Sequence, residues 1–202
     1  MKQKWIRTLS TCLILCLVCS LASPALAASF PDVSGLSTEY RDAINYVSDN
    51  SIIGGTAEGT FDPNTAVTRA VAVTVLYRMS GDTGTYTEAS QFPDVPSGTY
   101  YYNAVGWGVA NGIVTGAAEG YFYPYNTLTF QDLCVFMYRF AGKYGGLLTL
   151  DEDISSASDC SNISPYARFA VQWAYSFGLK VRTTDTDAIN PKNSVPRKDL
   201  AL

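Results

Sequence analysis

Two arginines in this 202-residue chain follow directly after positions that can begin a helix. Arg69 comes after Thr68, whose hydroxyl can accept a hydrogen bond from the amides of a first helical turn. Arg197 comes after Pro196, a residue tolerated near a helix start. A guanidinium offers a planar fork of donors to a carboxylate, and unpaired amides and the helix dipole add to the attraction. An arginine so placed can contact an anion, although most surface arginines are simply solvated; Arg197 is less well placed, because little chain follows it.

Aromatic side chains suggest a second kind of chemistry, stacking on sugar rings. Tyr100, Tyr101 and Tyr102 are consecutive, and three neighbours on one helix cannot all face inward. The three are therefore candidate carbohydrate contacts, with Tyr101 as the named site residue and packing against a neighbouring unit as the alternative. Trp107 and Trp173 lie beside apolar faces, so we expect both to pack in the core.

Catalytic chemistry finds little support in the composition. The chain has no histidine, which removes the usual general base, the Ser-His-Asp arrangement and most zinc sites. A glycosidase needs only two carboxylates, but the acidic residues are scattered through turns and linkers. Asp62-Pro63-Asn64 lacks the acidic ladder of a calcium loop. We therefore predict no catalytic residue, no metal and no cofactor.

The elements that position these residues come from an internal repeat with a spacing of 61 to 62 residues. Phe30-Pro31-Asp32-Val33 returns as Phe92-Pro93-Asp94-Val95, and Gly59-Thr60-Phe61-Asp62-Pro63 returns as Gly120-Tyr121-Phe122-Tyr123-Pro124. A weaker third copy includes Ser158-Asp159, Ala170-Val171-Gln172-Trp173-Ala174 and Ile189-Asn190-Pro191. The predicted units are 30–81, 92–143 and an incomplete 154–202. Tandem units with one apolar face each are expected to stack into one body.

Each unit is predicted to hold two helices joined by a glycine-rich loop. In the first unit a helix begins at Ser37 or Thr38, an apolar pair at Ile52-Ile53 forms a short extended piece, and Phe61 fills the core. The second helices begin at Thr68 and Thr129 and end near Gly81 and Gly142. Residues 82–91 and 145–153 are polar or glycine-rich and are expected to be linkers.

The N-terminus is typical of a secretory signal over residues 1–27, with basic residues, an apolar run of about thirteen residues and an Ala25-Leu26-Ala27 cleavage site. This run is shorter than the ~20 residues that span a bilayer, so no membrane insertion is expected after cleavage. Three of the 14 basic residues and none of the 18 acidic ones lie in it, which leaves a net charge of −7. Such a charge argues against nucleic acid or anionic membrane as partner. Cys134 is expected in the core rather than in a disulfide, although a pair with Cys160 stays open.

At these residues the chain resembles the S-layer homology family, whose units read roughly F-x-D-V, G-I-I-x-G, D-G-T-F-x-P-N and I-T-R-A-E. The first unit supplies Phe30-Pro31-Asp32-Val33, Ile52-Ile53-Gly54-Gly55, Glu58-Gly59-Thr60-Phe61-Asp62-Pro63-Asn64 and Val67-Thr68-Arg69-Ala70-Val71. The resemblance covers residues 30–202. It implies a mainly α fold, with three units in a pseudo-threefold arrangement around a central helical bundle. It also implies non-covalent binding of a secondary polysaccharide of a Gram-positive cell wall, often through a pyruvylated sugar.

In that family the arginine of T-R-A-E lies in a groove between units, so the resemblance implies that Arg69 and Thr68 bind the ligand. Asp32 and Asp94 are expected to cap local turns, and the resemblance implies that they also line grooves. Val71 stands in place of the family glutamate, Phe130 replaces the arginine in the second unit, and Arg197 restores it in the third. The second unit is therefore expected to have lost carboxylate recognition. The chain ends about one turn into the last helix, so we expect a fragment or a truncated product.

The sequence therefore predicts a secreted, non-catalytic module that holds a protein at the cell wall or S-layer surface by binding cell-wall polysaccharide, with Arg69 as the main anion contact. Two alternatives are a structural subunit of a surface lattice and the targeting part of a wall-active enzyme. The expected neighbours are other S-layer subunits or a cargo domain.

Overall fold

The computed structural model describes residues 30–179 and 187–202, and the predicted secretory signal lies outside the described residues. This part of the chain is mainly helical, as predicted, and contains isolated antiparallel bridges in place of a sheet. Its α-helices are α2 (Thr38–Asp49), α3 (Arg69–Met79), α4 (Tyr102–Ala110), α5 (Phe130–Lys143), α6 (Arg168–Ser176) and α7 (Arg197–Ala201). Its 3₁₀ turns are η1 (Pro31–Val33), η2 (Glu88–Gln91), η3 (Ala118–Gly120), η4 (Cys160–Asn162) and η5 (Pro165–Ala167).

The helix boundaries follow from the residues that cap them. Thr68 and Thr129 each accept a hydrogen bond from the third amide of their helix, at 3.4 Å from Val71 and 3.3 Å from Asp132. Both predicted caps are therefore confirmed. α3 ends at Met79 because the chain turns through Ser80 and the left-handed Gly81 (φ 67°), which a residue with a Cβ rarely adopts.

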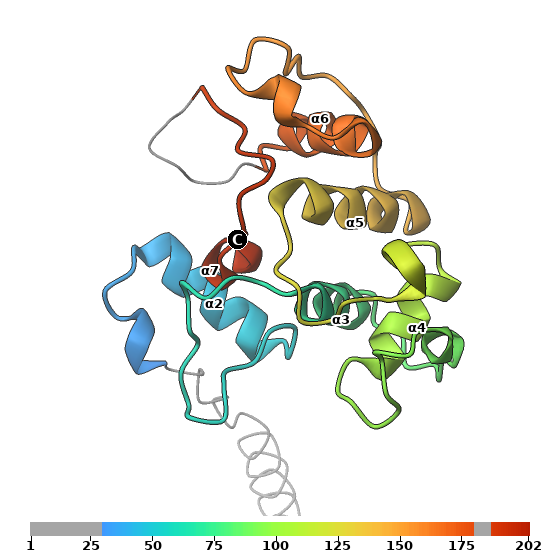
Figure 1. Ribbon diagram of the computed structural model, residues 1–202. Coiled ribbons are helices and arrows are strands. Elements are labelled where there is room, and N and C mark those ends of the chain that lie inside the picture. The colour runs from blue at the N-terminus through green and yellow to red at the C-terminus, as the bar shows by residue number, and fades with distance from the viewer. Residues whose placement is uncertain (1–29, 180–186) are drawn as a thin grey trace, which may run out of the picture.

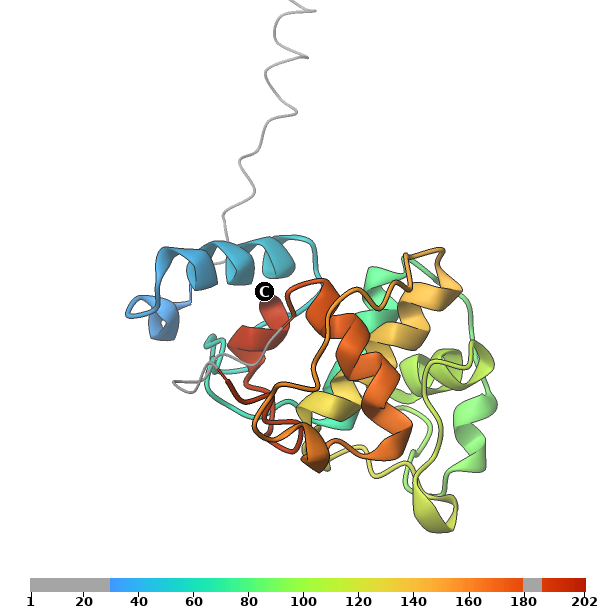
Figure 2. The ribbon, with the colours of Figure 1, turned by 90° about the horizontal axis from the view of Figure 1, so that it is seen from above.

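The helices pack in three pairs that link one predicted unit to another. Figure 1 shows α3 beside α4, α5 beside α6, and the short α7 beside α2, and the contacts between elements agree. In each pair, the second helix of one predicted unit lies against the first helix of the next. Because α7 packs against α2, the last helix of the described chain contacts the first α-helix. Figure 2 shows the same pairing from above, with α5 and α6 running alongside each other.

A ring of three backbone hydrogen bonds joins the segments that precede α3, α5 and α7. The amide of Val67 donates to the carbonyl of Val195 (2.8 Å), Val195 to Leu128 (3.4 Å), and Leu128 back to Val67 (2.8 Å). All three side chains are buried. Each member therefore needs the other two, because a missing partner would leave a buried polar group unpaired.

The first turns of the same helices are tied to the loops of the neighbouring segments. The amides of Arg69 and Ala70 donate to the carbonyls of Asn126 and Pro124, at 3.0 and 2.9 Å. The same two bonds recur at the starts of α5 and α7, with Asn193 and Pro191, and with Thr65 and Pro63. These amides were expected to be available to an anion; that expectation is wrong, because the fold uses them to join its segments.

Several large buried side chains were predicted. Phe61 and Trp107 have no exposed surface and Trp173 is 6% exposed, which confirms their predicted places in the core. Residues 82–91 are more than a linker, because Glu88–Gln91 forms η2 and Ala89 is buried against α4. Gly106 permits this approach, since an added Cβ would lie 2.8 Å from the Tyr86 Cβ.

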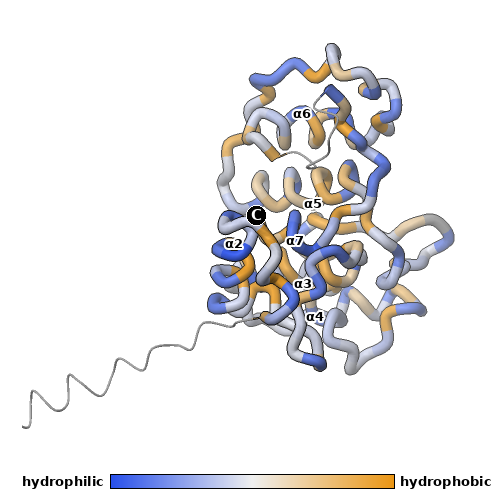
Figure 3. Tube along the Cα trace, turned by 90° about the vertical axis from the view of Figure 1, so that its left-hand side faces the viewer, coloured by the Kyte–Doolittle hydropathy of each residue, from blue (hydrophilic) through white to orange (hydrophobic). Residues whose placement is uncertain are grey.

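Two other expectations need correction. The apolar periodicity of Ala72, Val75, Leu76 and Met79 predicts that Met79 lies in a core seam. Met79 is instead 51% exposed, at the edge of an apolar groove of about 550 Å³ bordered by α2, α3, α5 and α7. Figure 3 shows hydrophobic segments where α2, α3 and α7 approach one another. The extended piece expected at Ile52-Ile53 forms no strand, and the bridges lie instead beside the helix starts.

A carboxylate fixes each of the loops that precede the helix starts. The two oxygens of Asp32 accept from the amides of Phe61 and Asp62, at 3.0 and 2.8 Å. Asp94 holds Phe122 and Tyr123 in the same way at 2.9 and 2.6 Å, and Asp159 holds Ile189 and Asn190 at 2.7 Å. The expected local turn-capping role of Asp32 and Asp94 is wrong, since the capped amides lie about thirty residues further along the chain.

We predict that acid releases the first of these loops. Burial tends to raise the pKa of Asp32, but the amides of Phe61 and Asp62 outweigh it and hold that pKa below 3.8. A depressed pKa means that the stabilisation is complete above the ordinary pKa and is lost as the pH falls through the folded-state value. The amide NMR shift of Phe61 should therefore titrate at a pH below the ordinary pKa of aspartate. In Asp32→Asn this titration should be lost, whereas Asp151→Asn, at an exposed position, should leave it as in the wild type. A midpoint at or above the ordinary pKa would contradict the loop-holding role.

Candidate functional site

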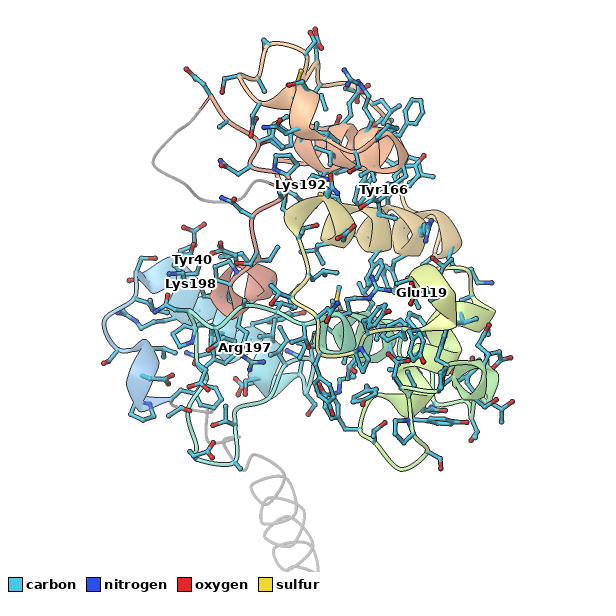
Figure 4. The ribbon with its side chains drawn as sticks, in the orientation of Figure 1. Tyr40, Glu119, Tyr166, Lys192, Arg197 and Lys198 are labelled. Atoms are coloured by element: carbon cyan, nitrogen blue, oxygen red, sulfur yellow. The ribbon has the colours of Figure 1, made fainter. Side chains whose placement is uncertain are left out.

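Arg197 bridges α7 and the glycine-rich loop of the first unit. Its Nε donates to the carbonyl of Phe61 and its Nη2 to that of Gly54, both at 2.9 Å. The guanidinium carbon lies 4.9 Å from the centre of the Phe61 ring, within cation–π range. Figure 4 shows Arg197 beneath α7, with Lys198 and Tyr40 nearby. Partial burial lowers the pKa of Arg197, and the nearby Asp62 carboxylate opposes that shift. Among the described residues, its Nη1 amino group has no hydrogen-bond partner.

Arg69 occupies the equivalent position against the loop of the second unit. Its Nε donates to the carbonyl of Phe122 (2.9 Å), its Nη2 to Thr115 (3.1 Å), and its guanidinium carbon is 4.8 Å from the Phe122 ring. Burial lowers the pKa of Arg69, and the charge of Asp132 acts most strongly against that shift. Arg69 and Arg197 are thus positioned in the same way, although the sequence ranked Arg69 well above Arg197.

The groove beside Arg197 has a volume of about 200 Å³ and a cationic lining. Arg78 lies in it, donating from Nη1 to the carbonyl of Ile52 at 3.1 Å. None of the lining residues is acidic: they are Ile52, Ile53, Gly54, Gly55, Val71, Thr74, Val75, Arg78, Tyr100 and Arg197. We call this the Arg197 groove. Two arginines and an exposed tyrosine line this groove, which suits a group that carries negative charge on a sugar.

The residue at the fourth position of the helix-start motif distinguishes the surroundings of the two arginines. Val71 faces the Arg197 groove, whereas the equivalent residue beside Arg69 is Asp132. The Asp132 carboxylate accepts from the Tyr166 hydroxyl at 2.5 Å and from the Thr129 hydroxyl at 2.6 Å. A partly buried carboxylate therefore already balances Arg69, whereas Asp62 near Arg197 is exposed and screened by water.

The sequence-predicted site residues do not converge on one place. Arg69 and Asp94 contact the second-unit loop, whereas Arg197 and Asp32 contact the first-unit loop. Thr68 uses its hydroxyl to cap α3. Asp32, Asp94 and Thr68 position loops and helices, so the charged donors that remain for a ligand belong to the arginines.

Tyr101 is not open to a ligand, which corrects its proposed role. Its side chain is 1% exposed, and burial together with the hydrogen bond to Tyr125 raises its pKa to about 12. Periodicity could not reveal this, because it shows that one of three adjacent tyrosines must point inward without showing which one. Tyr100, in contrast, is 61% exposed and lines the Arg197 groove.

Sequence reasoning also missed Arg78, although a pattern pointed to it. Arg78 and Arg139 recur at the 61-residue spacing near the ends of α3 and α5. Arg139 donates to the carbonyl of Ile113, 3.4 Å away, as Arg78 does to Ile52. The only indication in the sequence was that an arginine recurs in the last turn of both helices. The helix faces were defined from their apolar residues, so this recurrence was not used.

Other chemical features are limited in the described part of the chain. Cys134 and Cys160 are both free thiols there, and burial raises the pKa of Cys134 so that its thiol stays protonated. No cluster of three metal-ligating side chains occurs among residues 30–179 and 187–202. The helices in the same ranges are also too short or too polar to traverse a bilayer.

Comparison with known proteins identifies similar segments. The sequence model of the S-layer homology domain matches residues 29–70 and 91–134, which overlap the first two predicted units and begin one residue before each of them. The chain is 29% identical over 211 residues to an endoglucanase of Bacillus sp. (strain KSM-635), covering 100% of this chain and 22% of that protein. It is 27% identical over 195 residues to the Surface-layer 125 kDa protein of Lysinibacillus sphaericus, covering 92% and 16%.

A third relative is an amylopullulanase of Thermoanaerobacterium thermosulfurigenes, 27% identical over 164 residues, which covers 80% of this chain and 8% of the relative. The chain thus spans less than a quarter of the length of each of these relatives. The third predicted unit lies outside the two segments that match the domain model and stays a prediction.

We predict that the groove wall tolerates a methyl group at Gly54 but not at Gly55. A Cβ at Gly55 would lie 2.4 Å from Phe30 Cε1 and 2.9 Å from the Thr60 carbonyl oxygen, whereas one at Gly54 meets nothing within 4 Å. Gly55→Ala should lower the free energy of unfolding by about 1–3 kcal/mol through overpacking. Gly54→Ala, the matched control, should change it by less than about 0.5 kcal/mol. Urea denaturation measures both, and equal losses would show that the loop does not pack as described.

Proposed function

We propose that this chain is a non-catalytic anchoring module that binds an acidic cell-wall polysaccharide through the Arg197 groove. The observation that carries the proposal is a hollow lined by two arginines and no acid at the junction of α3, α7 and the Ile52–Gly55 loop. An anionic substituent there would meet the Nη1 group of Arg197 and the head group of Arg78. Because the hydrogen bonds to Phe61 and Gly54 already hold Arg197, little side-chain entropy would be lost on binding.

A carboxylate on a sugar, such as a pyruvyl group, fits this chemistry. The groove combines guanidinium donors with the apolar side chains of Ile53, Val71 and Val75. A ketal methyl beside a carboxylate would contact the apolar side while its charge meets the arginines. The recognition is therefore proposed to be directed at an acidic group with an apolar neighbour.

Arg69 is proposed as a weaker second contact. Its guanidinium has the same backbone anchors as Arg197, but Asp132 competes for its charge. Phe130 replaces an arginine at the start of α5, which removes the corresponding donor from the third junction. Thr68, Asp32 and Asp94 are proposed to support these contacts by holding α3 and the two loops. Tyr101 is left out of the ligand contacts.

The three-unit organisation, with boundaries 30–81, 92–143 and 154–202, is proposed as well. Asp159 contacts the 189–190 amides as Asp32 and Asp94 contact their loops, and α7 begins with the same neighbour-loop bonds as α3. These contacts favour a third unit and a pseudo-threefold arrangement. The helix pairs α3–α4, α5–α6 and α7–α2, each of which joins one predicted unit to another, favour this arrangement too.

We further propose that the chain acts at the bacterial surface after export. The domain match at two segments supports a wall-anchoring role. The relatives have different activities in their names, an endoglucanase, a surface-layer protein and an amylopullulanase, but share this segment. A segment that is shared by proteins with such different names is better explained by a common means of attachment than by a common catalytic reaction. A structural subunit of a surface lattice is the second candidate, favoured by the surface-layer relative alone.

The proposal predicts that wall binding depends on Arg197. In sedimentation with Lysinibacillus sphaericus sacculi, Arg197→Gln should weaken binding by about 1.5–3 kcal/mol, the range for a charged hydrogen bond. Arg78→Gln should also weaken it, and Arg69→Gln should have the smallest effect of the three. Arg168→Gln, at an exposed position on α6, should bind as the wild type does. Near-ultraviolet circular dichroism of each variant separates lost binding from lost structure.

The same assay distinguishes the two candidate functions. Sacculi stripped of their secondary polymer should no longer retain the wild-type chain if polysaccharide recognition is its role. Binding that survives stripping, together with ordered self-assembly of the free protein, would favour the lattice subunit and contradict anchoring through the groove.

A further inference from the structure

Two exposed tyrosine rings flank the buried ring of Tyr101. Tyr100 is 61% exposed and Tyr125 is 70% exposed, whereas Tyr101 between them is 1% exposed. The Tyr101 ring is 5.0 Å from the Tyr100 ring and 5.8 Å from the Tyr125 ring, and both pairs meet edge to face at 88°. The hydroxyls of Tyr101 and Tyr125 are 3.3 Å apart. Tyr101 therefore fixes the two outer rings while their surfaces stay in contact with water.

This tyrosine cluster continues the Arg197 groove. Tyr100 is one of the lining residues of that groove, and through Tyr101 it is connected to Tyr125 on the loop of the second unit. A ligand that places its charge against Arg197 and extends past Tyr100 would next meet Tyr125.

Core packing does not explain these aromatic residues. The positions 61 residues earlier hold Glu39 and Asn64, so the other well-matched unit has polar residues where this one has Tyr100 and Tyr125. An exposed ring contributes little burial, and large exposed aromatic surface commonly marks a binding site.

A strained backbone in the same loop points in the same direction. Tyr123 has a left-handed φ of 56°, and the equivalent residues Asp62 and Asn190 have φ values of 54° and 56°. Asp and Asn tolerate this conformation, but a bulky aromatic residue there is an outlier that costs free energy. Tyr123 stacks on Tyr121, with centroids 5.5 Å apart and rings inclined by 21°. The loop thus retains aromatic residues at a cost to its own stability.

We propose that Tyr100 and Tyr125 form a stacking surface for pyranose rings next to the acidic group held in the Arg197 groove. This inference rests on the proposed function and specifies how the neutral part of the same polysaccharide is bound. The C–H faces of a pyranose ring would lie on the exposed rings, and its hydroxyls would hydrogen-bond to water and to the tyrosine hydroxyls. Tyr101 is a positioning residue that acts through the two outer rings.

The test measures sedimentation with Lysinibacillus sphaericus sacculi for four forms of the full chain: wild type, Tyr100→Ala/Tyr125→Ala, Arg197→Gln and Tyr46→Ala. Tyr46 is 66% exposed on α2 and serves as the matched control. The double variant should bind about tenfold more weakly, with the slope of affinity against salt concentration unchanged, because rings and not charges have been removed. Arg197→Gln should weaken binding and flatten that slope, and Tyr46→Ala should match the wild type.

The four forms distinguish failure of the stacking surface from failure of the anchoring function. Weaker binding by Arg197→Gln together with unchanged binding by the double variant overturns the stacking surface and leaves the anchoring function in place. A loss of salt dependence in the double variant also overturns it, because the tyrosines would then act through the groove charges. Failure of the wild-type chain to bind the sacculi overturns the anchoring function and the stacking surface together. Tyr101→Phe, which keeps the ring and removes its hydroxyl, should retain most of the binding if Tyr101 only supports its neighbours.

Discussion

The structure depends on three buried backbone hydrogen bonds that close a ring through Val67, Leu128 and Val195. Each bond joins segments that lie 60 or more residues apart, so none can form until the chain has brought distant parts together. The helices beyond the ring then start with their first amides already paired to a neighbouring loop. Because those amides are satisfied within the protein, the proposed ligand contacts fall to side chains that project from the junctions.

Arginine has a structural role at these junctions, which comes in addition to its proposed role in binding. Arg69 and Arg197 each join a helix start to two loop carbonyls and lie over a buried phenylalanine. A lysine could not form this pair of directed bonds, because its ammonium is a single point on a flexible stem. The same anchoring leaves donors of Arg197 facing a groove without acidic residues. Val71 and Asp132 occupy one position in the repeat, so Arg69 has a neighbouring carboxylate where Arg197 has an apolar side chain.

Much of the fold could be predicted from the sequence, whereas only part of the candidate site could be. Caps such as Thr68 and apolar periodicity are local features, so the helices and their ends followed from nearby residues. The pairing of each helix with one from the next unit is a long-range property that a pattern in one unit does not contain. Asp32 shows the same limit: its type suggested a turn cap, but the amides it holds lie near residue 61. The choice among Tyr100, Tyr101 and Tyr102 depended on packing around Tyr125, which the sequence does not display.

Amide hydrogen exchange at the ring tests this account most directly. If closure of the three segments holds the molecule together, the amides of Val67, Leu128 and Val195 should open only on global unfolding. Their exchange should then give one shared free energy that equals the value from denaturant unfolding, and all three should lose protection together in Leu128→Ala. Fast exchange at Val195 with continued protection at Val67 and Leu128 would contradict it, because the first two segments would then be stable without the third.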